Sequence, residues 1–160
     1  MAEKEKIVLV VFSGELDKAL AAFNIAVTGA AMGMEVTMYF TFWGLNLVRK
    51  EKAKGKPAGI MRRMLGMLNK GGARRARLSK FHMCGLGTWM MKKLMRQSKM
   101  PSLPEMITMA NKMGVKFVAC TTTMALNGLT EESFIPEVKV FAGASTYLGE
   151  ARESKVNLFI

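Results

Sequence analysis

Apolar residues recur along the chain with two different periods, and their alternation predicts the fold class. Residues 7–12 (IVLVVF) form an unbroken, β-branched-rich run, typical of a strand that is covered on both faces. From about residue 15 to 32 the apolar positions follow a helical stripe, and residues 34–42 (MEVTMYFTF) return to a strand pattern. A strand, a helix and a strand in this order form a βαβ unit with parallel strands. The pattern therefore predicts an α/β protein.

The segment 44–100 interrupts this rhythm with charged loops and two amphipathic patterns. Residues 49–56 (RKEKAKGK) and 74–80 (RRARLSK) are strongly basic. Apolar positions at helical spacing predict two short helices, each backed by Arg and Lys, so we expect a basic, Met-rich helical insertion between the second and third strands. The apolar faces of these helices are Ile60, Met61, Met64, Leu65 and Leu68 in the first, and Leu86, Trp89, Met90, Leu94 and Met95 in the second.

Alternating helices and strands resume after Pro101. Ser102 and Glu105 have the spacing of a capping box, which begins a helix that reaches about Met113. The expected architecture is a single domain, residues 1–160, in three layers: a mostly parallel five-stranded sheet with helices on both faces. The remaining elements are expected as strands at residues 115–120, 138–141 and 156–160, a short helix from about Thr123 and a helix at residues 144–153.

The net charge of +12 is concentrated in the insertion. Residues 44–100 carry 16 Lys and Arg against 1 acidic residue, whereas the rest of the chain carries 8 against 11. This local excess predicts contact with an anionic substrate, an acidic partner or another subunit, and basic amphipathic helices can also bind a membrane surface. Nucleic acid is disfavoured as a partner, because only Phe81 and Trp89 interleave aromatic rings with the basic residues.

Several classes of protein and site are disfavoured by the sequence. The apolar run after the charged start is too short for a secretion signal, and no run approaches the roughly 18–20 apolar residues that span a bilayer, so we expect a cytoplasmic location. Two cysteines and one histidine cannot supply a four-ligand zinc site. The loop after residue 12 lacks the glycine-rich phosphate motifs. We therefore expect neither a metal nor a bound cofactor.

Candidate binding residues follow the strands, because ligands of open parallel sheets bind beyond the carboxyl ends of the strands. Cys120 is the best-placed nucleophile, since a helix that begins just after it directs free N–H groups at the sulfur and lowers the pKa of the thiol. Neighbouring threonine hydroxyls could hold a thiolate or an oxyanion. The candidates are Ser13 and Gly14 after the first strand, Trp43 after the second, and Cys120, Thr121, Thr122 and Thr123 after the third.

The same residues also allow a purely structural interpretation. A cysteine at the end of an apolar strand, as Cys120 is, can be a small buried hydrophobe. Cys84 could be a second carrier thiol or a resolving thiol, or a loop residue without a role. His82 could be a proton partner or a surface residue. Cys84 and His82 are therefore accessory candidates.

Five segments of the sequence carry a family resemblance: AMGMEVTMYFTFWGL (31–45), GLG (85–87), PSLPEMITMA (101–110), GVKFVAC (114–120) and TYLGEA (146–151). Together they resemble the DsrE/DsrF-like superfamily, specifically its DsrE3-type branch. The resemblance implies a small α/β homo-oligomer that carries sulfane sulfur as a persulfide or thiosulfonate on one cysteine. The implied partners are sulfur carriers of the TusA or rhodanese type. Cys120 occupies the family's cysteine position, whereas the resemblance transfers no role to Cys84.

Three functional hypotheses remain open. In the first, a sulfurtransferase-like carrier, the Cys120 thiolate accepts sulfane sulfur or a thiosulfonate group and passes it to a partner thiol, while the basic insertion holds an anionic sulfur compound or an acidic partner. In the second, a non-enzymatic oligomer docks to a membrane surface or a membrane redox complex through its basic, Met-rich helices. In the third, a peroxide-reducing protein uses Cys120 as the attacking thiol and Cys84 as the resolving thiol.

Overall fold

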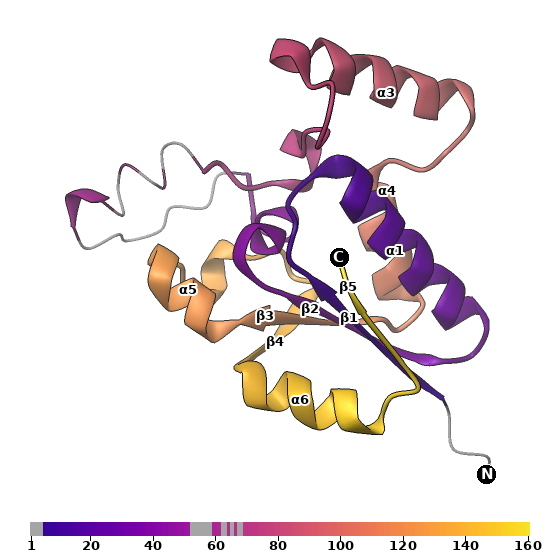
Figure 1. Ribbon diagram of the computed structural model, residues 1–160, viewed down its shortest axis with the longest axis vertical. Helices are drawn as coiled ribbons and strands as arrows, with labels where there is room; N and C mark the ends of the chain where they lie inside the picture. Colours follow the sequence, from indigo (N-terminus) through magenta and orange to yellow (C-terminus); the bar gives the residue numbers. More distant parts are fainter. Residues whose placement is uncertain (1–4, 52–58, 62–63, 65, 67–68) are drawn as a thin grey trace.

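The computed structural model describes residues 5–51, 59–61, 64, 66 and 69–160 (Figure 1). Its strands form one sheet in the order β4-β3-β2-β1-β5, and every pair of neighbouring strands is parallel. The α/β class is confirmed, and the sheet expected to be mostly parallel is parallel throughout. The strands are β1 (Lys6–Val11), β2 (Glu35–Phe40), β3 (Lys116–Cys120), β4 (Val138–Ala142) and β5 (Val156–Phe159).

Helices lie on both faces of the sheet, which gives the expected three layers (Figure 1). Helices α1 (Leu16–Ala31) and α4 (Leu103–Lys112) cover one face, and α6 (Ala144–Glu153) covers the other. Right-handed crossovers explain this division: the chain crosses the sheet in one direction from β1 to β4, and the return from β4 to β5 places α6 on the opposite face. The short helix α5 (Thr121–Asn127) begins at the carboxyl end of β3.

Side-chain alternation divides the apolar core between the two faces. On the α1 and α4 side, Phe23 of α1 packs against Phe40 and Phe117 of the sheet, with ring centroids 6.1 and 5.9 Å away. A smaller cluster on the α6 side contains Val10, Tyr39, Val118 and Cys120, with Tyr147 of α6 packed against it. Cys120 therefore belongs to the smaller cluster and faces α6.

Between β2 and α4 the chain forms short 3₁₀ turns and one long helix. The turns are η1 (Phe42–Leu47), η2 (Ala73–Arg75) and η3 (Met83–Gly85), and the helix is α3 (Leu86–Gln97), at the position expected for the second amphipathic helix. Residues 60, 61, 64 and 66 are helical, which agrees with the first. Leu65 and Leu68 of its expected apolar face, and residues 52–58, lie outside the described residues.

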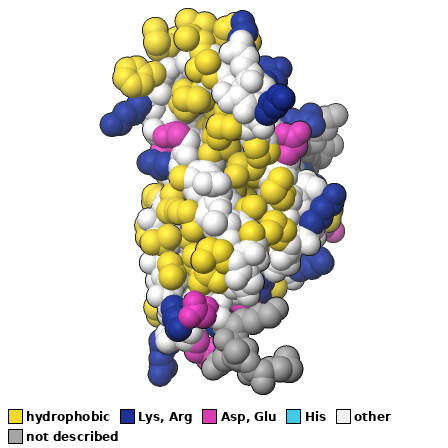
Figure 2. Space-filling model, turned by 90° about the vertical axis from the view of Figure 1, so that its right-hand side faces the viewer, with side chains coloured by type: hydrophobic (Ala, Val, Ile, Leu, Met, Phe, Trp, Pro, Cys, Tyr) yellow, Lys and Arg dark blue, Asp and Glu magenta, His cyan; other side chains and the backbone are white. Residues whose placement is uncertain are grey.

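The expected apolar face of α3 is largely uncovered in this chain. Met95 is buried, but Leu86, Trp89, Met90 and Leu94 are each more than half exposed. Figure 2 shows apolar side chains that continue from α3 down this side of the molecule. Docking of α3 to another subunit, a partner or a membrane stays a prediction. Within the described part of the chain, no helix is long and apolar enough to cross a membrane.

The turn η1 is fixed against β1 by a glycine. The backbone N–H of Gly44 donates to the carbonyl oxygens of Phe12 and Thr41, at 2.8 and 2.9 Å. A Cβ atom at residue 44 would lie 1.9 Å from the carbonyl oxygen of Val11, closer than any side-chain carbon can approach. The glycine of the FTFWGL segment is therefore required by close backbone packing.

We expect Gly44→Ala to lower the free energy of unfolding by about 1–3 kcal/mol, because η1 must shift to admit the methyl group. Gly149→Ala is the matched control: Gly149 lies within α6, and a Cβ there meets no atom within 4 Å. The control should be stabilised by about 0.5–1 kcal/mol, since alanine is the better helix former. Urea unfolding of both variants tests this, and equal effects would contradict the packing argument.

Candidate functional site

The candidate nucleophile lies at the junction of β3 and α5. Cys120 is the last residue of β3 and the N-cap residue of α5, with extended backbone angles (φ −70°, ψ 113°). The two preceding residues of the strand, Val118 and Ala119, are also buried. Only 6% of Cys120 is exposed, so its sulfur is protected from bulk solvent.

Three hydroxyl groups surround the Cys120 sulfur. Tyr39 lies near the end of β2, Thr41 follows that strand directly, and Thr123 lies in the first turn of α5; each hydroxyl is a hydrogen-bond partner of the thiolate. Thr41 and Thr123 also lie 3.1 Å apart, Oγ1 to Oγ1. Thr123 Oγ1 accepts the Phe42 N–H at 3.4 Å, which leaves its own hydroxyl hydrogen available as a donor.

These hydroxyls outweigh the effect of burial on the thiol. Burial raises the pKa of Cys120, but hydrogen bonds from Tyr39, from the Thr123 backbone and hydroxyl, and from Thr41 lower the pKa from 9.0 to about 7. The pKa of Tyr39 moves upward, first because the phenol is buried and then because of its contact with Cys120. Cys120 is therefore substantially ionised near neutral pH, while Tyr39 keeps its proton and can donate it.

Tyr39 has two competing acceptors. Its hydroxyl donates to the carbonyl oxygen of Ala142 in β4, at 3.2 Å. A single hydroxyl hydrogen cannot serve both this carbonyl and the sulfur of Cys120 fully. The Tyr39 hydroxyl can therefore turn toward the sulfur when Cys120 ionises and back toward Ala142 when the charge is removed.

Cys120 opens into a cavity of about 630 Å³ that lies between the sheet, α5 and α6. Among the described residues that line it there is no Lys, Arg, Asp or Glu. Its polar groups are the thiol and hydroxyls, so it favours a neutral or weakly charged group at the sulfur over a small dianion. The lining consists of Val10, Tyr39, Thr41, Phe42, Cys120, Thr122, Thr123, Ala125, Leu126, Ala144, Tyr147 and Phe159.

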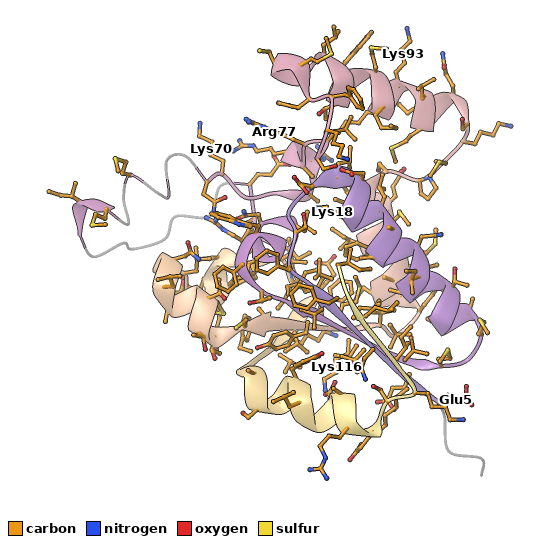
Figure 3. All side chains as sticks on the ribbon, in the orientation of Figure 1. Glu5, Lys18, Lys70, Arg77, Lys93 and Lys116 are labelled. Carbon is orange, nitrogen blue, oxygen red and sulfur yellow. The ribbon has the colours of Figure 1, made fainter. Side chains whose placement is uncertain are left out.

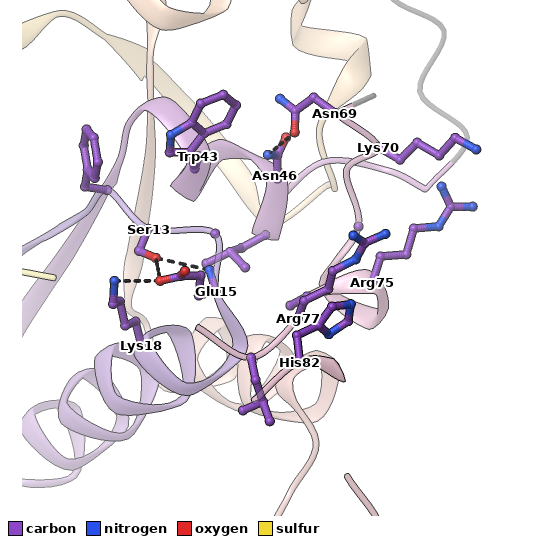
Figure 4. A pocket seen from close by; sticks show the side chains of 16 residues that line it. Ser13, Glu15, Lys18, Trp43, Asn46, Asn69, Lys70, Arg75, Arg77 and His82 are labelled. Atoms are coloured by element: carbon purple, nitrogen blue, oxygen red, sulfur yellow. Dashed lines mark hydrogen bonds and ion pairs between the residues drawn. The ribbon is translucent and has the colours of Figure 1, made fainter. Parts of the chain in front are cut away.

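The other expected binding residues line a different cavity, of about 1130 Å³, at the ends of β1 and β2 (Figure 4). Ser13, Gly14, Trp43 and His82 all lie there. The structure thus divides the strand-end candidates into two groups: Thr122 and Thr123 share the cavity of Cys120, whereas these four residues do not. Their roles remain predictions.

Cys84, His82 and Thr121 do not line the cavity of Cys120. Cys84 is exposed in the turn before α3, with φ at +53°, and lines neither cavity. His82 Nδ1 lies 2.8 Å from the Thr88 hydroxyl, and His82 lines the larger cavity rather than that of Cys120. Thr121 is exposed and does not line the Cys120 cavity. Across the described residues, no group of three His, Cys, Asp or Glu side chains could hold a metal.

Tyr39 and Thr41 were missed by the sequence interpretation. Both lie in the run 34–42, two residues apart, and therefore on one face of the strand. The register of β2 on β3 pairs Tyr39 with Val118 and Phe40 with Ala119, which places Tyr39 and Thr41 beside Cys120. The sequence did contain a signal for these two residues: hydroxyl side chains at alternate positions, 39 and 41, at the end of an otherwise apolar strand.

The fold and this site define a class: small α/β proteins with a thiol of lowered pKa at the carboxyl end of a parallel strand. The sequence profile of the DsrE/DsrF/DrsH-like family matches residues 3–159 of this chain. The chain belongs to this family. It is 42% identical to the uncharacterized protein YrkE of Bacillus subtilis, over 99% of this chain and 98% of that one.

A second relative carries a functional name. The sulfur carrier protein DsrE2 of Allochromatium vinosum is 32% identical, over 99% of both chains. Among solved structures, the protein of unknown function MTH1491 from Methanobacterium thermoautotrophicum superposes with a TM-score of 0.56, covering 98% of this chain and all of that one. Its 10% identity supports the fold alone.

We expect Tyr39→Phe to raise the apparent pKa of Cys120 by about 1–2 pH units, because a charge-assisted hydrogen bond is lost while burial remains. The rate of iodoacetamide alkylation against pH, measured in a Cys84→Ser background, reports this pKa. Tyr147→Phe is the control, since the Tyr147 ring lines the same cavity but gives the sulfur no hydrogen bond that lowers its pKa. Identical profiles for the two variants would contradict the role of Tyr39.

Proposed function

We propose that this protein is a sulfur carrier in which Cys120 accepts a sulfane sulfur atom as a persulfide and passes it to a partner thiol. The observation that carries the proposal is a buried thiol with a pKa lowered to about 7 inside an apolar, hydroxyl-lined cavity. Membership of a family that includes a named sulfur carrier supports the same assignment.

Loading is a substitution at sulfur. The Cys120 thiolate attacks the outer sulfur of a donor persulfide, a new S–S bond forms on Cys120, and the donor's own S–S bond breaks. The donor leaves as a thiolate, which takes up the proton that the persulfide carried. The transferred sulfur keeps its oxidation state, so the step needs no oxidant or reductant.

Unloading is the same type of substitution, with Cys120 now as the leaving group. A thiolate of the acceptor attacks the outer sulfur on Cys120, and Cys120 departs as a thiolate. A thiol of low pKa is the better leaving group, so Tyr39, Thr41 and Thr123 assist this step by receiving the returning negative charge. The same three hydroxyls therefore serve both directions of transfer.

A persulfide fits this cavity better than a thiosulfonate group or a small anionic sulfur compound. The residues that line it provide no cation to neutralise such an anion. Basic residues of the insertion, such as Arg75 and Arg77, line the larger cavity instead. Of the two expected forms of bound sulfur, we therefore favour the persulfide.

The cavity rim suggests how the sulfur is delivered. Phe42, Leu126 and Phe159 line the cavity and are 48%, 57% and 70% exposed. An apolar rim of this kind is typical of a protein contact rather than of a site for a free inorganic ion. The proposed donor and acceptor are therefore cysteines carried by small sulfur-carrier proteins of the TusA or rhodanese type. A cytoplasmic homo-oligomer is part of the same proposal.

Incubation with a small-molecule persulfide should add one sulfur atom to the wild-type protein, as measured by intact mass. Cys84→Ser should load equally, because Cys84 is outside the cavity. Cys120→Ser should not load. Thiosulfate should react more slowly than the persulfide, because no described residue that lines the cavity is cationic. An adduct that survives Cys120→Ser, or no adduct on the wild type, would refute the proposal.

Peroxide should not produce a Cys84–Cys120 bond. Cys84 lies in the turn that leads into α3, whereas Cys120 faces α6 on the other side of the sheet (Figure 1). We expect the peroxide-treated protein to give peptides in which Cys84 and Cys120 are not linked, as read by non-reducing mass spectrometry. A quantitative intramolecular disulfide would instead support the peroxide-reducing hypothesis.

A further inference from the structure

The larger cavity lies apart from Cys120 and has two chemically different walls (Figure 4). Trp43, from η1, lies on one side near Asn46 and Asn69. Arg75 and Arg77 lie on the other. The cavity has a volume of about 1130 Å³. Pockets that bind small molecules and cofactors typically have volumes of roughly 300–1000 Å³, so this cavity is large enough for such a ligand.

The basic wall carries positive charge that no described carboxylate of the chain neutralises. Among the described residues, no carboxylate lies within ion-pair distance of Lys70, Arg75 or Arg77. Of the described residues that line the cavity, only Glu15 is acidic, and it already accepts the Ser13 hydroxyl at 3.0 Å and pairs with Lys18 at 2.6 Å. Figure 3 places Lys70 and Arg77 near Lys18, at the opposite end of the sheet from Lys116.

A buried cation lies behind the same cavity. Arg49 is only 8% exposed, and its guanidinium donates to Asn46 Oδ1 at 3.0 Å and to the Asn69 carbonyl at 3.2 Å. Its Nε has no hydrogen-bond partner, and no described carboxylate pairs with it. Asn46 and Asn69 both line the cavity, so this charge adds to the positive potential there.

The opposite wall presents an aromatic ring on a closely packed stretch of backbone. Trp43 is 47% exposed. Its backbone is held in place on both sides: a Cβ on Gly14 would come within 2.6 Å of the Trp43 carbonyl oxygen, and Gly44 next to it bonds to β1. Asn46 Nδ2 donates to Asn69 Oδ1 at 2.6 Å, which sets the orientation of the Asn69 amide. A flat ring could therefore stack on Trp43 with an amide at its edge.

We propose that this cavity binds a nucleoside phosphate, with its base against Trp43 and its phosphates on Arg75, Arg77 and Lys70. Arginine binds phosphate through parallel, charge-assisted hydrogen bonds, and the ring supplies a stacking surface. Side chains hold the phosphates, so no glycine-rich backbone loop is needed. An inorganic anion would use the basic wall and leave the aromatic wall empty.

Binding is independent of sulfur transfer, because Cys120 does not line this cavity. Cys120→Ser should therefore bind the nucleotide as the wild type does. A failure of the nucleotide proposal leaves the persulfide test unaffected, and a failure of persulfide loading leaves this binding test unaffected.

The test is titration with metal-free ATP, followed by Trp43 fluorescence in a Trp89→Phe background and by calorimetry. We expect saturable quenching, with Kd raised about tenfold or more in Arg75→Gln/Arg77→Gln. The matched control, Arg74→Gln/Arg152→Gln, removes the same charge from arginines that do not line this cavity and should change Kd less than about threefold. The unfolding temperature checks that each variant is folded.

Tripolyphosphate and adenosine separate the two walls. Both should bind more weakly than ATP, and Trp43→Leu should weaken ATP, measured by calorimetry, while leaving tripolyphosphate unchanged. No ATP binding at millimolar concentration would overturn the proposal. So would equal losses in the two arginine double variants, or tripolyphosphate binding as tightly as ATP with no effect of Trp43→Leu, because the site would then be a surface for polyanions in general.

Discussion

The site depends on the parallel pairing of β2 with β3 in one register. Tyr39 pairs with Val118 and Phe40 with Ala119, so alternation along both strands directs Tyr39, Thr41 and Cys120 to the face covered by α6. A slip of one residue would send the two hydroxyls to the α1 side and leave the sulfur among apolar groups. The burial of Phe40 and Phe117 against Phe23 on the α1 side opposes such a slip. The packing of one face thus maintains the chemistry of the other.

Two opposing effects then set the reactivity of Cys120. Burial alone would keep the thiol protonated and inert, whereas the surrounding hydroxyls stabilise the thiolate, and their combined effect is larger. A buried thiolate of this kind is both ready to attack and screened from water.

The turn η1 links the two cavities. Phe42 lines the cavity of Cys120, and the next residue, Trp43, lines the basic one. The backbone next to these two residues is held by hydrogen bonds. The Gly44 N–H donates to the carbonyl oxygens of Phe12 and Thr41, and the Phe42 N–H donates to Thr123 Oγ1. The FTFWGL segment therefore forms one wall of each cavity, which is a physical reason for glycine and aromatic residues to occur together there.

The sequence predicted the α/β class, the strand ends and the position of Cys120, because each follows from local periodicity. It did not separate Cys120 from Ser13 and Trp43. All three follow parallel strands at one edge of the sheet, and only the pleat and the course of η1 direct them into different cavities. Tyr39 was missed for the same reason, since its neighbour Cys120 is remote in sequence and adjacent only through the strand register.

The most direct measurement is a relay of isotopically labelled sulfane sulfur. The protein is loaded from a labelled persulfide, freed of donor and mixed with an acceptor thiol in a single turnover. The label should enter and leave through Cys120, with a loading rate that follows an apparent pKa near 7 and falls at neutral pH in Tyr39→Phe. Label that loads without Cys120, or that never reaches the acceptor, would contradict the proposed relay.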